Sequence, residues 1–379
     1  MCFFRFSVFF LLCLLPKSIV LFGEVIEPVF IPNARSAALG GIHTGLGDDF
    51  YTIFTNPASF VGIEDQFSAG ELSLSVYGPI FEIIDLARNA LDSGNNLDIS
   101  GITGAAGFTA GFDMAGPVSL GWVGRGLGLG IFNRTKAKAS MTGTTVRPLL
   151  LEDILLVGGY SFRFIDKKNH ILDAGFLGKG FYRGSLEFKT SVFDAMSMFD
   201  DPMNNEFKTY LGLGVDLGLR YTFADNLTFA LVCYDVYSPT LVTVYDSLND
   251  FIDKKYPSSS GNYATVYRCL NAGIKYRIRS EFLDRYISNL IILADYRDML
   301  DLFAPIPRNP ILNIGLGVEL LALNVLSLRA GITDALPAAG FGIDFGITRF
   351  DCAIHGKELG LDPGVQPVYA FDIALLFRY

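Results

Sequence analysis

Residues that could carry enzymatic chemistry are sparse in this sequence. Its three histidines, His43, His170 and His355, have no cysteine or glutamate partner at the spacing of a metal site. A serine–histidine pair for hydrolysis stays open on residue types alone, although no motif indicates one. The Gly-Leu-Gly-Leu-Gly run that starts at Gly126 fits the small face of a strand better than a phosphate loop. We therefore predict no enzyme activity, no metal site and no cofactor.

Charged side chains are the second group of residues that could form a functional site. Acidic residues gather between positions 24 and 65, with Asp48 and Asp49 adjacent. Five arginines stand at the ends of alternating segments: Arg163, Arg220, Arg277, Arg279 and Arg378. Ion pairs strengthen where water is scarce, so we predict that these arginines hold the acidic segment in place. A ligand carboxylate is the alternative partner for the same cations.

The composition indicates which elements position these groups. Half of the 379 residues are apolar, yet no apolar run approaches the roughly 20 residues of a membrane-spanning helix. Apolar residues instead alternate with small or polar ones over segments of about ten residues, which is typical of transmembrane β-barrels. A soluble β-sandwich also alternates, but its outward face is the polar one.

Two segments show the alternation clearly. Leu211, Leu213 and Val215 begin an apolar face that continues to Phe223, opposite a face of Gly, Asp, Arg and Thr. In the last segment, aromatic and aliphatic residues from Tyr369 to Tyr379 share one face. We assign the apolar face to lipid and the other to a lumen.

Fourteen such segments are predicted strands of an all-β, antiparallel barrel with both termini in the periplasm. The predicted strands are 67–77, 118–124, 127–141, 153–164, 171–183, 208–223, 227–240, 263–279, 287–298, 311–320, 325–332, 339–347, 349–355 and 368–379. Long outer loops alternate with short periplasmic turns. Residues 24–65 lack steady alternation and precede the barrel of residues 66–379, so we predict that they form a separate compact segment.

Residues 1–23 have the features of a signal peptide, with Arg5 followed by an apolar stretch and Pro16. Lipid attachment at Cys13 is a less favoured alternative. Loss of Arg5 and Lys17 lowers the formal charge from −9 to −11, which argues against a nucleic-acid partner. The sequence leaves open whether any of Cys233, Cys269 and Cys352 are bridged.

Apolar residues recur at helical spacing in three outer loops, near 78–117, 184–207 and 241–262. The candidates for a ligand-capture surface are Ile80, Ile83, Ile84, Phe193, Met196, Val244, Tyr245, Leu248 and Phe251. Packing of short helices on one another explains the pattern equally well. The sharper hypothesis is a landing surface for a hydrophobic ligand, because outer loops have little other reason to be so apolar.

The third predicted strand has an unusual outward face, which changes from Leu127, Leu129 and Ile131 to Asn133 and Thr135. Counted from the turn at 125–126, Asn133 and Thr135 lie within the roughly ten residues that cross the membrane. Polar side chains facing lipid are unfavourable. We therefore hypothesise a local opening in the wall there; a strand that leaves the membrane early is the alternative.

A family resemblance rests on three short motifs. Arg35-Ser36-Ala37-Ala38-Leu39-Gly40-Gly41, then Gly47-Asp48-Asp49, then Thr55-Asn56-Pro57-Ala58 resemble the N-terminal plug of the long-chain fatty acid outer-membrane transporter family. This family includes importers of aromatic hydrocarbons and a branch tied to protein secretion. The match covers about 25 residues, and Ser59-Phe60 stand where the family usually has Gly and an aliphatic residue.

The resemblance implies a plug inside the barrel, whose central turn is Asn56, Pro57 and Ala58, with Phe54 and Phe60 as flanking aromatic candidates. From sequence physics alone, Asn-Pro marks an ordinary turn. The resemblance further implies passive import, with ligand captured at outer loops and released sideways through the third strand. The expected partners are long-chain fatty acids or similar hydrophobic molecules and outer-membrane lipid, bound by a monomer. A secretion-associated structural barrel and a small-solute porin are the alternatives.

Overall fold

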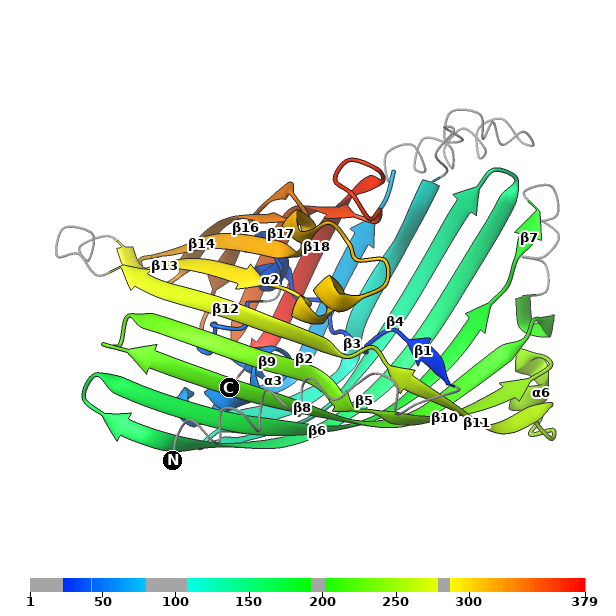
Figure 1. The fold of residues 1–379 in the computed structure, drawn as a ribbon, viewed down its shortest axis with the longest axis horizontal. Helices are drawn as coiled ribbons and strands as arrows, with labels where there is room; N and C mark the ends of the chain where they lie inside the picture. The colour runs from blue at the N-terminus through cyan, green and yellow to red at the C-terminus, as the bar shows by residue number, and fades with distance from the viewer. Residues whose placement is uncertain (1–22, 42, 80–107, 192–201, 279–286, 379) are drawn as a thin grey trace.

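The computed structural model describes residues 23–41, 43–79, 108–191, 202–278 and 287–378. Over these residues the chain is an antiparallel β-barrel of fourteen strands, closed by pairing of the last strand with the first (Figure 1). The strands are β2 Gln66–Tyr77, β3 Phe108–Gly124, β4 Leu127–Thr142, β5 Thr145–Lys167, β6 His170–Glu187, β8 Phe207–Phe223, β9 Leu227–Tyr237 with β10 Pro239–Tyr245, β11 Ser259–Val266 with β12 Cys269–Ile278, β13 Ile287–Tyr296, β14 Ile314–Ala322, β15 Leu326–Thr333, β16 Leu336–Asp344, β17 Thr348–Glu358 and β18 Pro367–Arg378. The two-residue β7, Thr190–Ser191, pairs with the start of β5.

The predicted alternation places side chains as expected. In β18, Phe371 is 42% exposed and faces outward, whereas its neighbour Asp372 is 4% exposed and faces the lumen. Leu211 and Leu213 of β8 are likewise among the most exposed apolar residues of the wall. An apolar outer face around a closed hydrogen-bonded sheet is what a bilayer requires of strands, because no edge or backbone group is left unpaired in lipid.

Several predicted boundaries are wrong, and two of them are instructive. The second strand begins at Phe108 rather than 118, so part of the expected first loop is wall. Its first half, rich in Gly and Ala, has too little apolar contrast for the alternation to stand out. In the loop near 241–262, Val244 and Tyr245 extend strand β10, and only α6, Leu248–Ile252, is helical. The β-branched run from Thr240 to Val244 favours a strand over the helix that the spacing indicated.

The two ends of the barrel differ. At one end, here called the turn end, β3–β4, β5–β6, β8–β9, β14–β15 and β16–β17 join through two or three residues each. At the opposite loop end, the connections include 246–258, 297–313 and 359–366. Within the described part of the chain, no helix is long and apolar enough to cross a bilayer.

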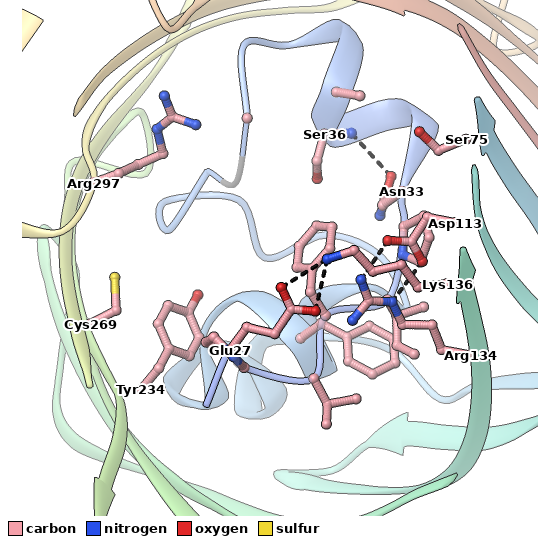
Figure 2. A pocket seen from close by; sticks show the side chains of 18 of the residues that line it. Glu27, Asn33, Ser36, Ser75, Asp113, Arg134, Lys136, Tyr234, Cys269 and Arg297 are labelled. Atoms are coloured by element: carbon pink, nitrogen blue, oxygen red, sulfur yellow. Dashed lines mark hydrogen bonds and ion pairs between the residues drawn. The ribbon is translucent and has the colours of Figure 1, made fainter. Parts of the chain in front are cut away.

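Residues 23–41 and 43–65, named the luminal segment, run through the interior of the barrel (Figure 2). The segment contains β1 Glu24–Ile26, which pairs in parallel with β11, and α2 Ala34–Ala38, α3 Thr52–Thr55 and η2 Pro57–Gly62. Phe50, Ile53 and Phe60 of the segment pack with Phe132 and Leu155 of the wall in the main core cluster. The core of this barrel is therefore the interface between the luminal segment and the wall.

Candidate functional site

A cavity of about 450 Å³ lies in the lumen between the luminal segment and the wall (Figure 2). Its volume is within the range of pockets that hold small molecules. One part of the lining is apolar: Val29, Phe30, Ile31 and Phe54 from the luminal segment, and Leu155, Val157 and Leu177 from β5 and β6. Phe30 is 39% exposed, so an aromatic ring is available to a molecule in this space.

The rest of the lining is polar or charged, and most of its charges are paired. Lys136 of β4 binds Glu27 of the luminal segment at 2.8 Å. Burial alone would raise the pKa of Glu27, but the Lys136 ammonium outweighs it and lowers that pKa below its usual value. Nearby, Lys179 bridges two wall carboxylates, Asp216 at 2.8 Å and Asp235 at 2.7 Å. The cavity thus combines an apolar side with a polar side whose charges are mostly paired.

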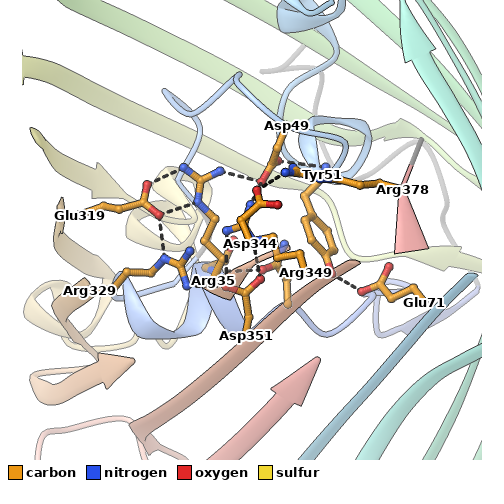
Figure 3. A network of polar contacts seen from close by, with 12 residues as sticks. Arg35, Asp49, Tyr51, Glu71, Glu319, Arg329, Asp344, Arg349, Asp351 and Arg378 are labelled. Carbon is orange, nitrogen blue, oxygen red and sulfur yellow. Dashed lines mark hydrogen bonds and ion pairs between the residues drawn. The ribbon is translucent and has the colours of Figure 1, made fainter. Parts of the chain in front are cut away.

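Around Arg35 of α2, a buried ion-pair network fastens the luminal segment to β14–β17 (Figure 3). Arg35 is 6% exposed and binds Asp48 at 2.9 Å, Asp49 at 2.6 Å and Glu319 of β14 at 2.5 Å. Burial opposes ionisation of Asp48, but the charge and hydrogen bonds of Arg35 are stronger. They hold the pKa of Asp48 well below the usual range. Arg349 of β17 also lies 3.6 Å from Asp49. Every acid of this network has an arginine within reach.

Two of the predicted anchoring arginines have partners outside the luminal segment. Arg163 binds Asp173 of the neighbouring strand at 2.8 Å, and Arg378 binds Asp344 of the nearby turn. Arg220 and Arg277 face the lumen at the turn end, and Arg279 lies outside the described residues. The sequence analysis did not select Arg35 as an anchoring residue, although Arg35 begins the first motif of the family resemblance. It also passed over Glu319, whose signal is a carboxylate on the inward face of an otherwise apolar strand.

The Asn-Pro-Ala turn joins α3 to η2 and holds the luminal segment against the wall. Asn56 accepts a hydrogen bond from Ala58 N at 3.0 Å and donates to Leu219 O of β8 at 3.3 Å. Pro57 begins η2, where its missing N–H costs nothing. Gly175 makes this contact possible, because a Cβ there would lie 2.4 Å from the Pro57 carbonyl oxygen.

The two aromatic candidates pack on the wall next to this turn. Phe54 meets Phe132 edge to face, with the ring centroids 4.7 Å apart. Phe60 is fully buried, and its ring lies where side chains on Gly128 and Gly159 would be. The family resemblance named both rings as candidates, whereas the glycines beside Phe60 are visible only in the fold.

The wall is interrupted beside β3. Pairing of β2 with β3 stops at Ser68 and resumes at Ser73, and pairing of β3 with β4 skips residues 116–118. Pro117 lies in this interruption and has no N–H for the ladder. Asn133 of β4, a predicted lateral-opening residue, accepts a hydrogen bond from Val118 N at 3.0 Å. Its side chain therefore binds one backbone amide of the stretch of β3 that skips pairing.

Both faces of the interruption carry polar contacts. On the outer face, Thr135 donates to Glu152 of β5 at 2.5 Å, and Glu152 also accepts from Asn133 at 3.4 Å. On the inner face, Tyr51 of the luminal segment donates to Glu71, which is 2% exposed. The structure therefore places Asn133 and Thr135 at this irregularity in strand pairing and adds Glu152 and Glu71, which the sequence analysis missed.

The remaining candidates are spread over the molecule. Phe251 of α6 packs on Tyr245 and Phe207 at the loop end, and Leu248 opens the same helix. Ile80, Ile83, Ile84, Phe193 and Met196 lie outside the described residues. Cys233, Cys269 and Cys352 are unbridged.

The three histidines occupy three separate environments. His43 is fully buried with its Nδ1 3.4 Å from Asp295, His355 lines the cavity 3.3 Å from Asp372, and His170 stacks on Tyr221. In the described ranges, no three His, Cys, Asp or Glu side chains are placed to hold a metal ion.

A closed antiparallel barrel with an apolar outer face defines an outer-membrane β-barrel. No protein-family model and no curated protein matches the chain. Similar solved structures are the Ralstonia pickettii toluene transporter TbuX (12% identity, TM-score 0.49, 95% of this chain and 99% of that chain), the Pseudomonas putida toluene transporter TodX (11%, 0.45, 94% and 99%) and a Pseudomonas aeruginosa FadL homologue (12%, 0.45, 94% and 99%). These solved structures are what the chain resembles in fold.

Proposed function

We propose that this barrel imports hydrophobic molecules, such as long-chain fatty acids, by passive diffusion through its lumen. The observation that carries the proposal is the cavity of about 450 Å³, which is lined by apolar side chains of the wall and by the exposed ring of Phe30. Apolar surface favours cargo that loses water on entry, by roughly 25 cal/mol per Å² buried. A small-solute porin instead needs a water-filled lumen, which the buried luminal segment opposes.

In this proposal the luminal segment acts as a plug, the loop end faces outside and the turn end faces the periplasm. Phe50, Phe60 and the Arg35 network fill the lumen between the cavity and the turn end. The interruption beside β3 is then the proposed lateral exit, because that stretch of wall has fewer ladder hydrogen bonds to break. Lipid surrounds the wall, and a closed barrel of this size serves as a monomer without nucleic acid or cofactor.

Uptake of labelled oleate by cells that carry only this transporter tests the proposal. Val157 is 3% exposed and lines the apolar side of the cavity. Val157→Asn places an amide there, and a loss of about 1.4 kcal/mol in ligand stabilisation lowers uptake about tenfold. Val157→Ala keeps the wall apolar and is the matched control. Equal uptake by both variants would contradict the cavity as the route and favour the secretion-associated role.

A further inference from the structure

One cation serves two carboxylates on the polar side of the cavity. Lys179 of β6 lies 2.8 Å from Asp216 of β8 and 2.7 Å from Asp235 of β9. Both acids are 3% exposed, and all three side chains line the cavity. These three residues are here called the Lys179 cluster. One ammonium cannot neutralise two carboxylates, so the cluster has one negative charge in excess when both acids are ionised, and an excess charge is unfavourable where water is scarce.

Asp235 also has an unused hydrogen-bond acceptor. Its Oδ1 binds Lys179, whereas its Oδ2 is buried and has no hydrogen-bond partner among the residues that the structure describes. Both oxygens of a carboxylate accept hydrogen bonds, and buried polar atoms are normally paired. What the cluster lacks is therefore a hydrogen-bond donor.

The backbone of β9 turns Asp235 toward the cavity. Tyr234 lines the cavity and donates to Thr55 O of the luminal segment, so strict alternation would turn the next side chain outward (Figure 2). However, the pairing of β8 with β9 shifts register between Val215 and Leu217, and Asp235 has a φ of 51°. A β-bulge of this kind re-aims a side chain. It places an acid in the lumen at a position that a regular strand would expose to lipid.

The Lys179 cluster adjoins the apolar side of the cavity. Leu177 lies two residues before Lys179 on the same face of β6, and it pairs with Asp216 across the strands. Leu177 is 2% exposed and belongs to the apolar lining, together with Val157 of the neighbouring strand. An alkyl chain on this apolar side would therefore place its polar head group beside the cluster.

A carboxylate head group would find its cations elsewhere in the cavity. Lys136 is already bound by Glu27 at 2.8 Å. Lys357 of β17 lies over the ring of Tyr77, with its Nζ 5.9 Å from the ring centroid. The strand order places β17 across the lumen from β6, β8 and β9. Lys357 is therefore the rival position for a head group, and it would select the opposite charge.

We infer that the Lys179 cluster binds the head group of an amphipathic molecule whose head donates hydrogen bonds and has no negative charge, such as a primary amine or an alcohol. The inference rests on the proposed function, because the tail occupies the apolar side of the same cavity. An ammonium head compensates the excess charge and donates to Asp235 through charge-assisted hydrogen bonds, which are about twice as strong as neutral ones. A carboxylate head adds a third negative charge beside two acids and is disfavoured.

Calorimetric titration of the detergent-purified full chain with decylamine, decanol and decanoate tests the inference, because the three probes share one alkyl chain. At neutral pH we expect the wild type to bind decylamine at least tenfold more tightly than decanoate. Asp235→Asn should reduce this preference to about threefold or less. The matched control is Asp113→Asn, which removes another acid of the lining, one that Arg134 binds at 2.6 Å, and it should keep the preference.

The probes separate the possible head groups. Decanol bound as tightly as decylamine would assign the cluster to hydroxyl groups, and weaker binding of decanol would assign it to cations. Decanoate bound more tightly than decylamine, and lost in Lys357→Gln, would place the head group at Lys357 and overturn the inference.

The wild type alone decides the matter if Asp235→Asn does not fold, which heat-modifiable migration in gels checks. Equal affinities of the wild type for decylamine and decanoate, or an equal preference in the wild type and folded Asp235→Asn, would overturn the inference and leave the proposed function intact. Binding of none of the three probes would overturn both.

Discussion

The luminal segment meets two sides of the barrel in different ways. Toward β13–β17 it is held by buried charge: Arg35 on Glu319, Asp49 near Arg349, and the Thr44 amide and hydroxyl on Asp295 at 2.7 and 3.0 Å. Toward β2–β4 it is held by aromatic packing on Phe132, by the Tyr51–Glu71 hydrogen bond and by the half-exposed Glu27–Lys136 pair. The wall itself is interrupted on that second side.

The difference indicates where movement is easiest. A buried ion pair adds little net stability relative to apolar packing, but breaking it leaves a costly uncompensated charge, so it fixes one arrangement. Aromatic contacts have no such penalty for a small displacement. We therefore expect the segment to stay fixed on β13–β17 while contacts beside β3 change.

The largest effect is expected where the fixed side is broken. Arg35→Met leaves Asp48, Asp49 and Glu319 with too few cations, and removal of one partner of a buried pair typically costs about 3–5 kcal/mol. The expected result is a loosened luminal segment, measured as higher ion conductance in planar bilayers. The matched control is Arg125→Gln, because its pair with Asp65 is exposed and such pairs contribute under about 1 kcal/mol. Equal conductance of the two variants would count against anchoring by Arg35.

Acid should weaken the same side without a mutation. The pKa of Asp48 in the folded state is held below its ordinary value, which is near 4. A lowered pKa means that its stabilising effect is complete above about pH 4 and is lost as the pH falls through the folded pKa. Conductance should therefore stay constant from neutral pH to about pH 4 and rise below it.

Asp48→Asn isolates this titration, because it removes the ionisable group and keeps the shape. Its conductance should start higher and depend less on pH. A wild-type rise that begins near neutral pH, or an identical rise in Asp48→Asn, would assign the effect to other groups.

The smallest effect is expected at the interrupted side, because it changes function more than stability. The double change Asn133→Leu, Thr135→Leu removes the acceptor of the Val118 amide and both outer contacts of Glu152. Labelled-oleate uptake should fall about threefold, which corresponds to about 0.65 kcal/mol. Ile131→Leu on the same strand is the control. Unchanged uptake in the double variant would remove the lateral exit from the proposal.

Sequence reasoning predicted the fourteen strands because most outward faces, as in β8 and β18, are apolar with a period of two residues. It failed where residues are small, as in the first half of β3, and where a β-branched run also fits helical spacing, as at Val244. The partner of Asp48 was not predicted, because Arg35 lies on α2 of the luminal segment itself, where no strand alternation assigns a side chain to a face. The interruption beside β3 depends on strand register, which the outward polar residues Asn133 and Thr135 indicated only indirectly.

The central claim is that the lumen receives a hydrophobic molecule on the apolar side of the cavity. Native mass spectrometry of the detergent-extracted chain, followed by titration with labelled oleate, tests it most directly. We predict a retained or titratable hydrophobic ligand in the wild type that is lost in Val157→Asn and kept in Val157→Ala. An empty wild-type barrel with no affinity for oleate would contradict the account.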